Sequence, residues 1–190
     1  MKMGDFLRYF SFNLRYLGKP PWDTQTSPPE LLEFIHSHPA GNALDLGCGT
    51  GTNLLTLAQT GWGICGVDYV WLAVLKARTR LKKAGIEARV YCADVVDIDF
   101  LKQKFDLILD IGCFHGLSKN HKVIYMQNLN RLLNSPGSFL IYAYLQNGLN
   151  NFGLNETDFS EFCLQFQLNW RKDGTGRFER ACSWMQFGKK

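Results

Sequence analysis

The sequence predicts an α/β fold: a Rossmann-like, mostly parallel seven-stranded sheet with helices on both faces and a C-terminal antiparallel hairpin. Short apolar runs alternate with amphipathic segments of helical spacing along most of the chain, which is typical of strand–helix units in a parallel sheet. A turn with three glycines follows the first strand-like run, and two strand-like runs joined by a polar turn close the sequence. Right-handed crossovers between parallel strands leave few topologies open.

The composition fits one folded domain, since the chain has 190 residues and 46% of them are hydrophobic. We expect residues 1–190 to form a single domain, with residues 1–27 as an N-terminal segment and residues 28–190 as the Rossmann-like core. Six cysteines are scattered singly, which indicates reduced thiols and a cytoplasmic protein. No apolar run approaches the roughly twenty residues that span a bilayer, so no membrane partner is predicted.

The net charge of +4 is mild and does not by itself indicate a nucleic-acid partner. Basic residues concentrate between Lys76 and Lys83, and such a run usually forms the solvated face of an outer helix. No zinc-site spacing of cysteine and histidine occurs in the sequence. We therefore expect a monomer or homodimer that binds neither nucleic acid nor metal.

The N-terminal segment is predicted to begin with a short amphipathic helix over residues 5–17. Its apolar positions near helical spacing are Phe6, Leu7, Phe10, Leu14 and Leu17. An extended, proline-rich stretch follows. A second helix is predicted from Pro28 to His36, with Ser27 as its N-cap and Glu30 as the capping-box partner.

The run ALDLGCGTGTN, from Ala43 to Asn53, joins an apolar strand to a glycine-rich turn and a helix. Its first residues suit a central parallel strand, with Asp45 near the strand end. The glycines let the backbone turn tightly and approach a ligand that any Cβ would push away. Because the following helix directs its N-terminal amides at the same place, the run predicts a nucleotide-like cofactor.

The pattern repeats after this turn. A strand is predicted over Trp62–Val67, ending at Asp68, and then a helix closed by Gly85. The predicted buried face of that helix is Trp71, Val74 and Leu75. Further strands are EARVYCAD, ending at Asp94, FDLILDIGC, ending near Asp110, and SFLIYAY.

The last third of the chain holds a predicted helix over residues 119–134 and a short one from Glu156 to Phe162. Two strands, residues 163–170 and 178–187, are predicted to be joined by a turn over residues 172–176. Ligands of such sheets lie at the carboxyl ends of the parallel strands. Four acids fall at or beside those predicted ends: Asp45, Asp68, Asp94 and Asp110.

The motif D-x-G-x-G-x-G at Asp45–Gly51 resembles the first motif of class I S-adenosylmethionine-dependent methyltransferases. A dinucleotide fingerprint fits poorly, because Thr52 occupies the place of its third glycine. The resemblance implies that Asp68 grips the two ribose hydroxyls of S-adenosylmethionine and that Asp94 faces the adenine. The implied cofactor-binding residues are Asp45, Gly47, Cys48, Gly49, Gly51, Asn53, Asp68, Tyr69, Ala93, Asp94, Val95 and Asp110.

The segments PPWD, T-x-x-x-PPELLEF and LDIGCFHGL resemble small-molecule methyltransferases related to the thiopurine and tellurite-resistance enzymes. This resemblance implies that residues 1–27 form a lid, in which Phe10, Trp22 and Asp23 fold over the cofactor. The implied acceptor-binding residues are Trp22, Cys113, Phe114 and Tyr144. His115 is the candidate catalytic residue, as a general base or as a group that orients the acceptor. The alternatives are that Trp22 packs against the core and that His115 caps the next loop.

The predicted function is methyl transfer to a small nucleophile, such as a thiol or chalcogen, by in-line displacement. Alignment and desolvation supply most of the acceleration in such a reaction, so few indispensable side chains are expected. Base methylation is disfavoured, because residues 110–113 read Asp-Ile-Gly-Cys where the amino methyltransferases of bases carry Asn- or Asp-Pro-Pro-aromatic. Two alternatives from other classes are a non-catalytic cofactor-binding regulatory module and a nicotinamide-dependent oxidoreductase.

Overall fold

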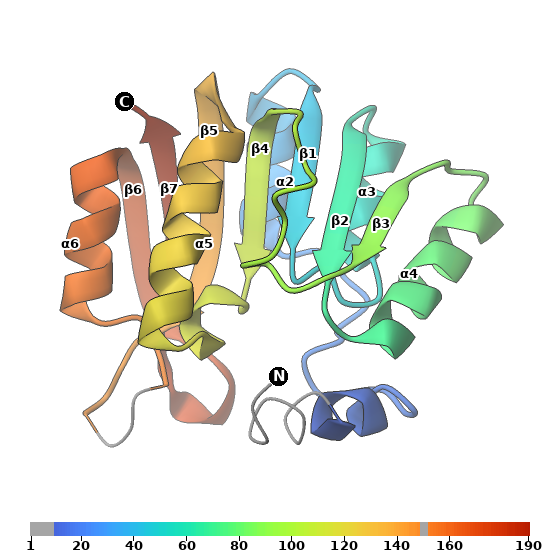
Figure 1. The fold of residues 1–190 in the computed structure, drawn as a ribbon, viewed down its shortest axis with the longest axis horizontal. Coiled ribbons are helices and arrows are strands. Elements are labelled where there is room, and N and C mark those ends of the chain that lie inside the picture. The colour runs from blue at the N-terminus through green and yellow to red at the C-terminus, as the bar shows by residue number, and fades with distance from the viewer. Residues whose placement is uncertain (1–9, 149–151) are drawn as a thin grey trace.

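The computed structural model describes residues 10–148 and 152–190, and shows a seven-stranded sheet in the order β3-β2-β1-β4-β5-β7-β6 (Figure 1). The strands are β1 (Asn42–Leu46), β2 (Gly63–Asp68), β3 (Arg89–Cys92), β4 (Phe105–Ile111), β5 (Leu133–Tyr144), β6 (Phe166–Thr175) and β7 (Ala181–Lys189). The helices are α2 (Pro29–Ser37), α3 (Thr52–Gln59), α4 (Trp71–Lys83), α5 (Lys119–Leu132) and α6 (Glu156–Gln165), with short 3-10 turns η1 (Phe114–Gly116) and η2 (Arg177–Glu179). The predicted Rossmann-like fold is confirmed.

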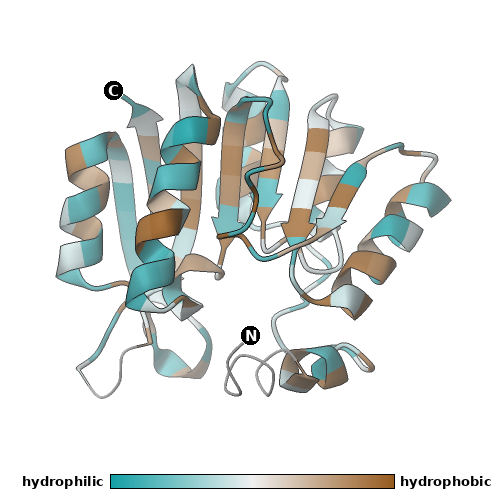
Figure 2. Cartoon of the chain, in the orientation of Figure 1, coloured by the Kyte–Doolittle hydropathy of each residue, from teal (hydrophilic) through white to brown (hydrophobic). Residues whose placement is uncertain are grey.

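Strands β1 to β5 run parallel, and β7 is antiparallel to both of its neighbours. Figure 1 shows α5 and α6 in front of the sheet and α2 and α3 behind it. Because the central strands are covered on both faces, most of their residues are apolar: Leu44 packs into the core beneath α5, and Ala43 into the core beneath α2. The central strands are largely hydrophobic and the edge strand β6 mostly hydrophilic (Figure 2).

The reversed direction of β7 brings its first residues to the carboxyl ends of the parallel strands. Tyr144, the last residue of β5, pairs with Cys182 of β7. The backbone N–H of Leu145 then donates to the carbonyl of Ala181 at 2.9 Å. The turn before β7 therefore lies at the edge of the sheet where ligands of parallel sheets bind.

The apolar face predicted for the N-terminal helix is wrong. Residues 10–15 are helical, but the predicted face is largely exposed: Phe10 (55%), Leu14 (50%) and Leu17 (71%). Phe6 and Leu7 lie outside the described residues. The buried residue is Tyr16, which packs against Val70. The segment rests on the turn after β2 and not on a sheet face, so the spacing of its aliphatic residues did not reveal its contact side.

Two further local predictions are wrong. Pro28, not Ser27, is the N-cap of α2, because the Ser27 hydroxyl donates to side chains of α3. Helix α4 exposes Trp71 (48%) and Leu75 (46%), since its small residues give the closest approach to the sheet and to α3. Its buried residues are Ala73, Val74, Ala77 and Leu81.

The C-terminal hairpin turns later than predicted. Strand β6 continues to Thr175, and the turn is formed by residues 176–180, where the Gly176 N–H donates to the Arg180 carbonyl at 2.8 Å. The Lys172–Gly174 stretch remains extended, and Asp173 there is held by Arg171 at 2.7 Å. Helix α6 runs three residues beyond Phe162, and β5 begins at Leu133 instead of Ser138. Across the described ranges, no helix has the length and apolarity needed to cross a membrane.

Candidate active site

The glycine turn between β1 and α3 has a backbone that other residues adopt poorly, because the glycines at 47, 49 and 51 all have positive φ angles (78°, 53° and 76°). The N–H groups of Gly47 and Cys48 donate to the carbonyl of Val67 at 2.8 and 3.0 Å, which ties the turn to β2. A Cβ at Gly47 would lie 2.9 Å from the Cβ of Cys113. The turn after β1 and the turn after β4 therefore touch.

The last glycine has a packing role. A Cβ at Gly51 would lie 3.0 Å from the Cβ of Ala77, so this glycine lets α3 and α4 approach closely. Asn53 was predicted to bind the cofactor. Its Oδ1 accepts a hydrogen bond from Ser27 Oγ at 3.0 Å, so this oxygen already has a partner within the protein. The buried Cys48 sits between these helices and β2, and burial raises the pKa of its thiol well above the ordinary value.

Asp68, at the end of β2, lies against the glycine turn. Its Oδ2 accepts from the N–H of Gly49 at 2.9 Å and its Oδ1 from the N–H of Val70 at 2.8 Å. Burial raises the pKa of Asp68 to about 6, and the two N–H donors act in the opposite direction. The carboxylate is thus mostly ionised at neutral pH. Each oxygen can accept a further hydrogen bond, so the pair suits a ligand with two adjacent hydroxyls.

Asp45 lies beneath the same turn and is 1% exposed. Among the described residues its Oδ2 has no hydrogen-bond partner, which is rare for a buried polar atom. Burial, followed by the negative charges of Asp110 and Asp68, raises the pKa of Asp45 well above its ordinary value. A donor with positive charge is the group that this position lacks.

The predicted adenine acid, Asp94, is exposed in the turn after β3. Its Oδ1 accepts from the N–H of Val96 at 3.1 Å. The neighbouring Ala93 N–H donates to the carbonyl of Asp68 at 3.0 Å, and Val95 is buried in the core beside this turn. The turns after β2 and β3 are therefore contiguous.

The N-terminal segment covers the turns after β1 and β2. Tyr16 is 4% exposed, and its hydroxyl would lie 3.3 Å from a Cβ at Gly49. Trp22 donates from its Nε1 to Tyr16 Oη at 3.0 Å, so its indole is held on Tyr16. Asp23 accepts at its Oδ1 from the Thr50 hydroxyl at 3.1 Å.

Further aromatic rings of the N-terminal segment lie next to the turns after β1 and β2. The ring of Phe12 lies 5.6 Å from that of Trp22 and 5.8 Å from that of Tyr69. Phe10 stays 55% exposed. Tyr16 was not among the residues predicted for this region. Its sequence signal is an aromatic ring with a polar hydroxyl in the N-terminal segment, which suits a residue that covers a site and forms a hydrogen bond there.

Asp110 was predicted to bind the cofactor, but its carboxylate is completely enclosed by the protein. Its Oδ1 accepts from the N–H of Cys113 at 2.8 Å, and its Oδ2 from the N–H of Phe114 at 3.0 Å and from the Tyr125 hydroxyl at 2.7 Å. Burial raises its pKa to about 6, against these donors. The residue is 0% exposed, and its hydrogen bonds fix the shape of the turn after β4.

Phe114 is also enclosed. It is 0% exposed and packs against Tyr125 and Phe162, at ring distances of 5.3 and 4.9 Å. The turn η1 directs this side chain into the core beneath α5 and α6, and the contact of Phe114 with the acceptor stays a prediction. Its neighbours point elsewhere: Cys113 faces the glycine turn, and His115 faces the end of β5.

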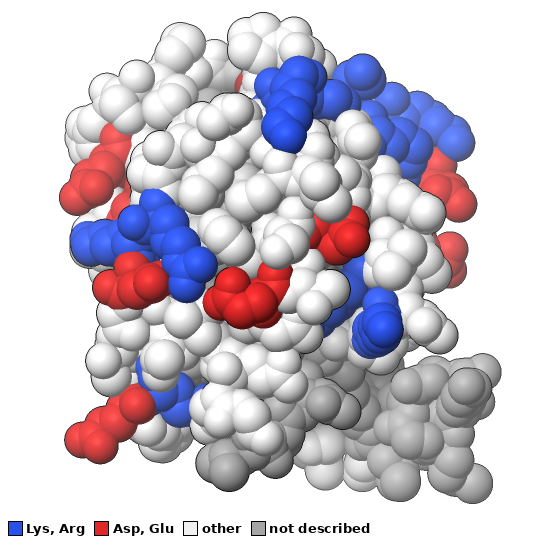
Figure 3. Space-filling model, turned by 90° about the vertical axis from the view of Figure 1, so that its left-hand side faces the viewer, with Lys and Arg blue, Asp and Glu red and all other residues white. Residues whose placement is uncertain are grey.

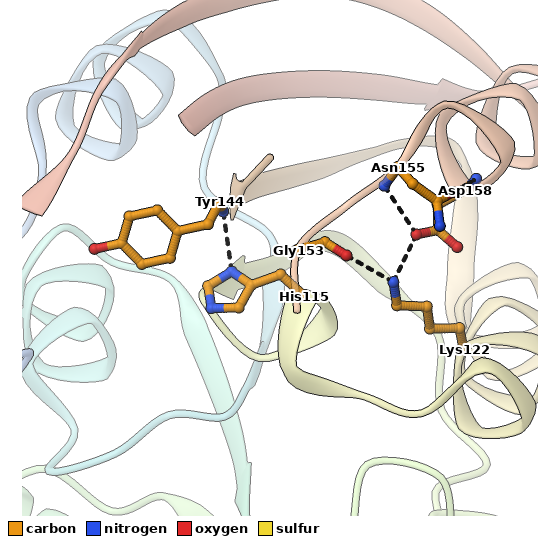
Figure 4. A network of polar contacts seen from close by, with 6 residues as sticks. All are labelled: His115, Lys122, Tyr144, Gly153, Asn155 and Asp158. Carbon is orange, nitrogen blue, oxygen red and sulfur yellow. Dashed lines mark hydrogen bonds and ion pairs between the residues drawn. The ribbon is translucent and has the colours of Figure 1, made fainter. Parts of the chain in front are cut away.

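The structure brings together His115 and Tyr144, which the sequence placed at the ends of different strands. His115 Nδ1 accepts a hydrogen bond from the backbone N–H of Tyr144 at 3.1 Å, and the two rings are 5.1 Å apart. Figure 4 shows the Tyr144 ring on one side of the imidazole and the Lys122 network on the other. Burial, then the positive charges of Arg180 and Lys122, lowers the pKa of His115 to about 3. The imidazole is therefore neutral at physiological pH, with its proton on Nε2.

A polar network fixes the other side of His115 (Figure 4). Lys122 Nζ donates to the Gly153 carbonyl at 2.9 Å and pairs with Asp158 at 2.6 Å. Asn155 and Asp158 cap α6 reciprocally. Because the Gly153 N–H donates to the His115 carbonyl at 3.0 Å, the network holds the loop before α6 against the turn after β4.

The surface charges and the titratable side chains of the described residues bear on the predicted partners. On the face shown in Figure 3, basic and acidic side chains are interspersed and in several places lie side by side. Within residues 10–148 and 152–190, no three side chains of His, Cys, Asp or Glu are grouped as metal ligands. The features of this edge of the sheet that can bind a ligand are the glycine turn, Asp68 and the His115–Tyr144 pair.

The chain is similar to known methyltransferases in sequence and in fold. A family model described as a methyltransferase domain matches residues 43–137, half of the chain. An uncharacterized methyltransferase of Schizosaccharomyces pombe is 26% identical over 111 residues, which cover 58% of this chain and 77% of that protein. A probable thiol methyltransferase of Arabidopsis thaliana is 29% identical over 130 residues, 65% of this chain and 56% of that protein.

A similar solved structure is that of the N-methyltransferase NodS from Bradyrhizobium japonicum, in complex with S-adenosyl-L-homocysteine. It superposes with a TM-score of 0.82 at 18% identity, and covers 95% of this chain and 97% of that one. At that level of identity the likeness concerns the fold.

Proposed function

This chain belongs to the methyltransferase domain family, and from this premise we propose that it transfers a methyl group from S-adenosylmethionine to a small-molecule nucleophile. The family resemblance predicted from the sequence is confirmed, and with it the prediction of a methyltransferase enzyme. S-adenosylmethionine is the predicted methyl donor, and the related fold of NodS binds its demethylated form. The alternative of a nicotinamide-dependent oxidoreductase is inconsistent with membership of a methyltransferase family.

One observation carries the assignment of the cofactor site: the carboxylate of Asp68 is bonded to the glycine turn itself, through Gly49 N–H at 2.9 Å. The acid and the turn thus form one rigid cradle. In our proposal the free acceptor positions of Asp68 take the two ribose hydroxyls. Asp94, with Ala93 and Val95, lies where the adenine would follow along the sheet edge.

The backbone of Gly47 to Gly49 would hold the methionine part of the cofactor. Its ammonium group would provide the donor and the positive charge that the buried Oδ2 of Asp45 lacks. Thus the orphaned carboxylate oxygen fits an amino-acid cofactor, and the exposed Asp94 fits a base at the outer end. Gly51, Asn53 and Asp110 support this cradle through packing and hydrogen bonds, and we assign them no contact with the cofactor.

Residues 1–27 include the lid. Within the described part of this segment, Tyr16, Trp22 and Phe12 supply aromatic rings over the glycine turn. Aromatic faces attract a cation such as a sulfonium, and covering the site excludes water. Because Trp22 is tied to Tyr16 and not to the turn after β4, we place it in the lid and not in the acceptor pocket.

The acceptor pocket is proposed to lie beside Cys113, His115 and Tyr144. When bound, S-adenosylmethionine supplies an electrophilic methyl group on a sulfonium: the nucleophile forms a new bond to the methyl carbon, and the departing sulfur keeps the electron pair of the old one. His115 presents a neutral Nε2–H, so it orients the acceptor as a hydrogen-bond donor. With a pKa near 3 it is a poor base.

A thiolate or similar soft nucleophile is the acceptor class that we propose, since such a nucleophile needs no base during the displacement. The likeness to a probable thiol methyltransferase supports this choice. The test is a screen with radiolabelled methyl donor across thiols, metalloid oxyanions, halides, amines and hydroxyl compounds. We expect label in one or more thiols or chalcogens. Transfer only to amines or hydroxyls would reject the acceptor class, and binding of the donor without transfer would favour the regulatory-module alternative.

A further inference from the structure

Arg180 is brought to the proposed acceptor pocket by the topology of the sheet. It immediately precedes β7, whose first residues pair with the end of β5. Its guanidinium carbon lies 4.7 Å from the ring centroid of Tyr144 and 4.6 Å from that of Phe152. The guanidinium therefore lies over both rings, whose centroids are 6.3 Å apart, and is held at the carboxyl ends of the parallel strands.

The two rings also contact His115. Its imidazole lies 5.1 Å from the ring of Tyr144 and 4.8 Å from that of Phe152. The other side of the imidazole faces the turn after β4, since a Cβ at Gly112 would lie 3.2 Å from His115 Cε1. Contacts thus join the glycine turn to Cys113 in the turn after β4, and join His115 of the same turn through Tyr144 to Arg180.

The positive charge of Arg180 has no carboxylate counterpart in the part of the chain that the structure describes. The ion pairs found there involve other basic residues, and the neighbouring Lys122 is committed to Asp158 at 2.6 Å. Arg180 is only half-buried, so part of this residue remains accessible. A planar guanidinium that is held on aromatic rings is pre-organised for bidentate binding of a carboxylate.

The turn that carries Arg180 is conformationally strained. Phe178 and Glu179 both have left-handed backbones, with φ angles of 58° and 55°, and such non-glycine conformations persist where the surroundings enforce them, often at ligand clamps. The turn is closed by the Gly176–Arg180 hydrogen bond. A Cβ at Gly176 would lie 2.5 Å from the Tyr142 hydroxyl. The loop is therefore pressed against β5, and this fixes the position of Arg180.

We propose that Arg180, stacked on Tyr144 and Phe152, binds a carboxylate of the methyl acceptor, at the far end of the pocket from the glycine turn. The inference rests on the proposed function and narrows its substrate class to an aromatic or otherwise flat thiol that also carries a carboxylate. The flat body lies on the rings, the carboxylate pairs with the guanidinium, and the nucleophile is directed past His115 toward Cys113.

The test uses two probes of nearly the same shape, the anionic 4-(methylthio)benzoate and the neutral 4-(methylthio)benzamide, which represent methylated products. Their binding to the full chain loaded with S-adenosylhomocysteine is measured by calorimetry. We expect the carboxylate to bind at least tenfold more tightly than the amide, and Arg180→Gln to abolish the difference. Arg177→Gln is the matched control, because Arg177 is exposed in the same turn. It should keep the preference.

Turnover gives a second readout. With 4-mercaptobenzoate as acceptor, Arg180→Gln should raise KM at least tenfold and leave kcat within about twofold, because the lost contact is remote from the reacting sulfur. Equal binding of the two probes by the native chain, binding of neither, or a preference that survives in Arg180→Gln would overturn the inference. Failure of S-adenosylhomocysteine to bind the native chain would instead reject the proposed function, so the two failures are distinguishable.

Discussion

The backbone N–H of Tyr144 donates a hydrogen bond to Nδ1 of His115 at 3.1 Å. Because the amide group can only donate, Nδ1 carries the lone pair and Nε2 carries the proton. The last residue of β5 thereby sets the tautomer of a side chain that follows β4. Of the two roles predicted for His115, this geometry favours orientation of the acceptor over proton abstraction.

The first prediction concerns the rate of methyl transfer. His115→Ala should lower kcat/KM for a thiol acceptor by about three- to tenfold, since a neutral hydrogen bond contributes about 0.5–1.5 kcal/mol. The pH dependence of kcat/KM should keep its shape, because it reports the thiol of the acceptor. Steady-state rates between pH 5.5 and 8.5 provide the measurement. A loss of the acidic limb in the variant would show that His115 does act as the base.

The low pKa of His115 also predicts a pH-dependent stability. Its folded value of about 3 lies below the ordinary 6.5, so the unfolded chain takes up the proton first as the pH falls. The stabilisation from a neutral His115 is present above pH 6.5 and is lost progressively below it. We therefore expect the free energy of unfolding of the native chain, relative to His115→Asn, to decrease from pH 7.5 to 5.

Urea unfolding at several pH values measures this difference. The comparison with the variant is needed because Asp68 and Asp110, each with a folded pKa of about 6, act in the opposite direction. Their raised values favour the folded state at low pH in both proteins. A difference between the two proteins that does not change with pH would contradict the buried, neutral state of His115.

Asp110 is predicted to stabilise the fold and not to bind the cofactor. Asp110→Ala leaves the Cys113 and Phe114 N–H groups and the Tyr125 hydroxyl without their acceptor, and each unsatisfied buried group costs about 1–3 kcal/mol. We expect a loss of about 3 kcal/mol or more in the free energy of unfolding, measured with urea, and about 1 kcal/mol for Tyr125→Phe.

The exposed acid Asp99 offers the matched control, and Asp99→Ala should leave the stability within about 0.5 kcal/mol of the native value. If Asp110→Ala unfolded like the native chain but lost affinity for S-adenosylhomocysteine, Asp110 would be a cofactor ligand after all.

Much of the fold could be predicted because its signals are local. Residues 43–53 carry the strand, the turn and the helix start within one short run, and the glycines at 47, 49 and 51 have the positive φ angles that this pattern requires. Asp68 could likewise be placed, since it ends a strand that must lie beside the first one.

The predictions were incomplete where contacts between segments that are distant in sequence determine the direction of a side chain. Phe114 and His115 are neighbours in sequence, yet the hydrogen bonds of Asp110 to the turn direct Phe114 into the core and leave His115 beside Tyr144. The position of Arg180 depends on the reversed direction of β7 and on a turn that continues to residue 180. The burial of Tyr16 depends on the contact between the N-terminal segment and the turn after β2. No local periodicity encodes these contacts.

The most direct test of the proposed cofactor site is a calorimetric titration of the native chain and of Asp68→Ala with S-adenosylhomocysteine. We predict one site per chain in the native protein. In Asp68→Ala the affinity should fall about tenfold or more, because a hydrogen bond to a charged group contributes about 1.5–3 kcal/mol. The affinity of the native chain should also decrease below pH 6, where Asp68 becomes protonated. Equal affinity of the two proteins, or no binding to either, would contradict the assignment of Asp68 and the glycine turn as the cofactor cradle.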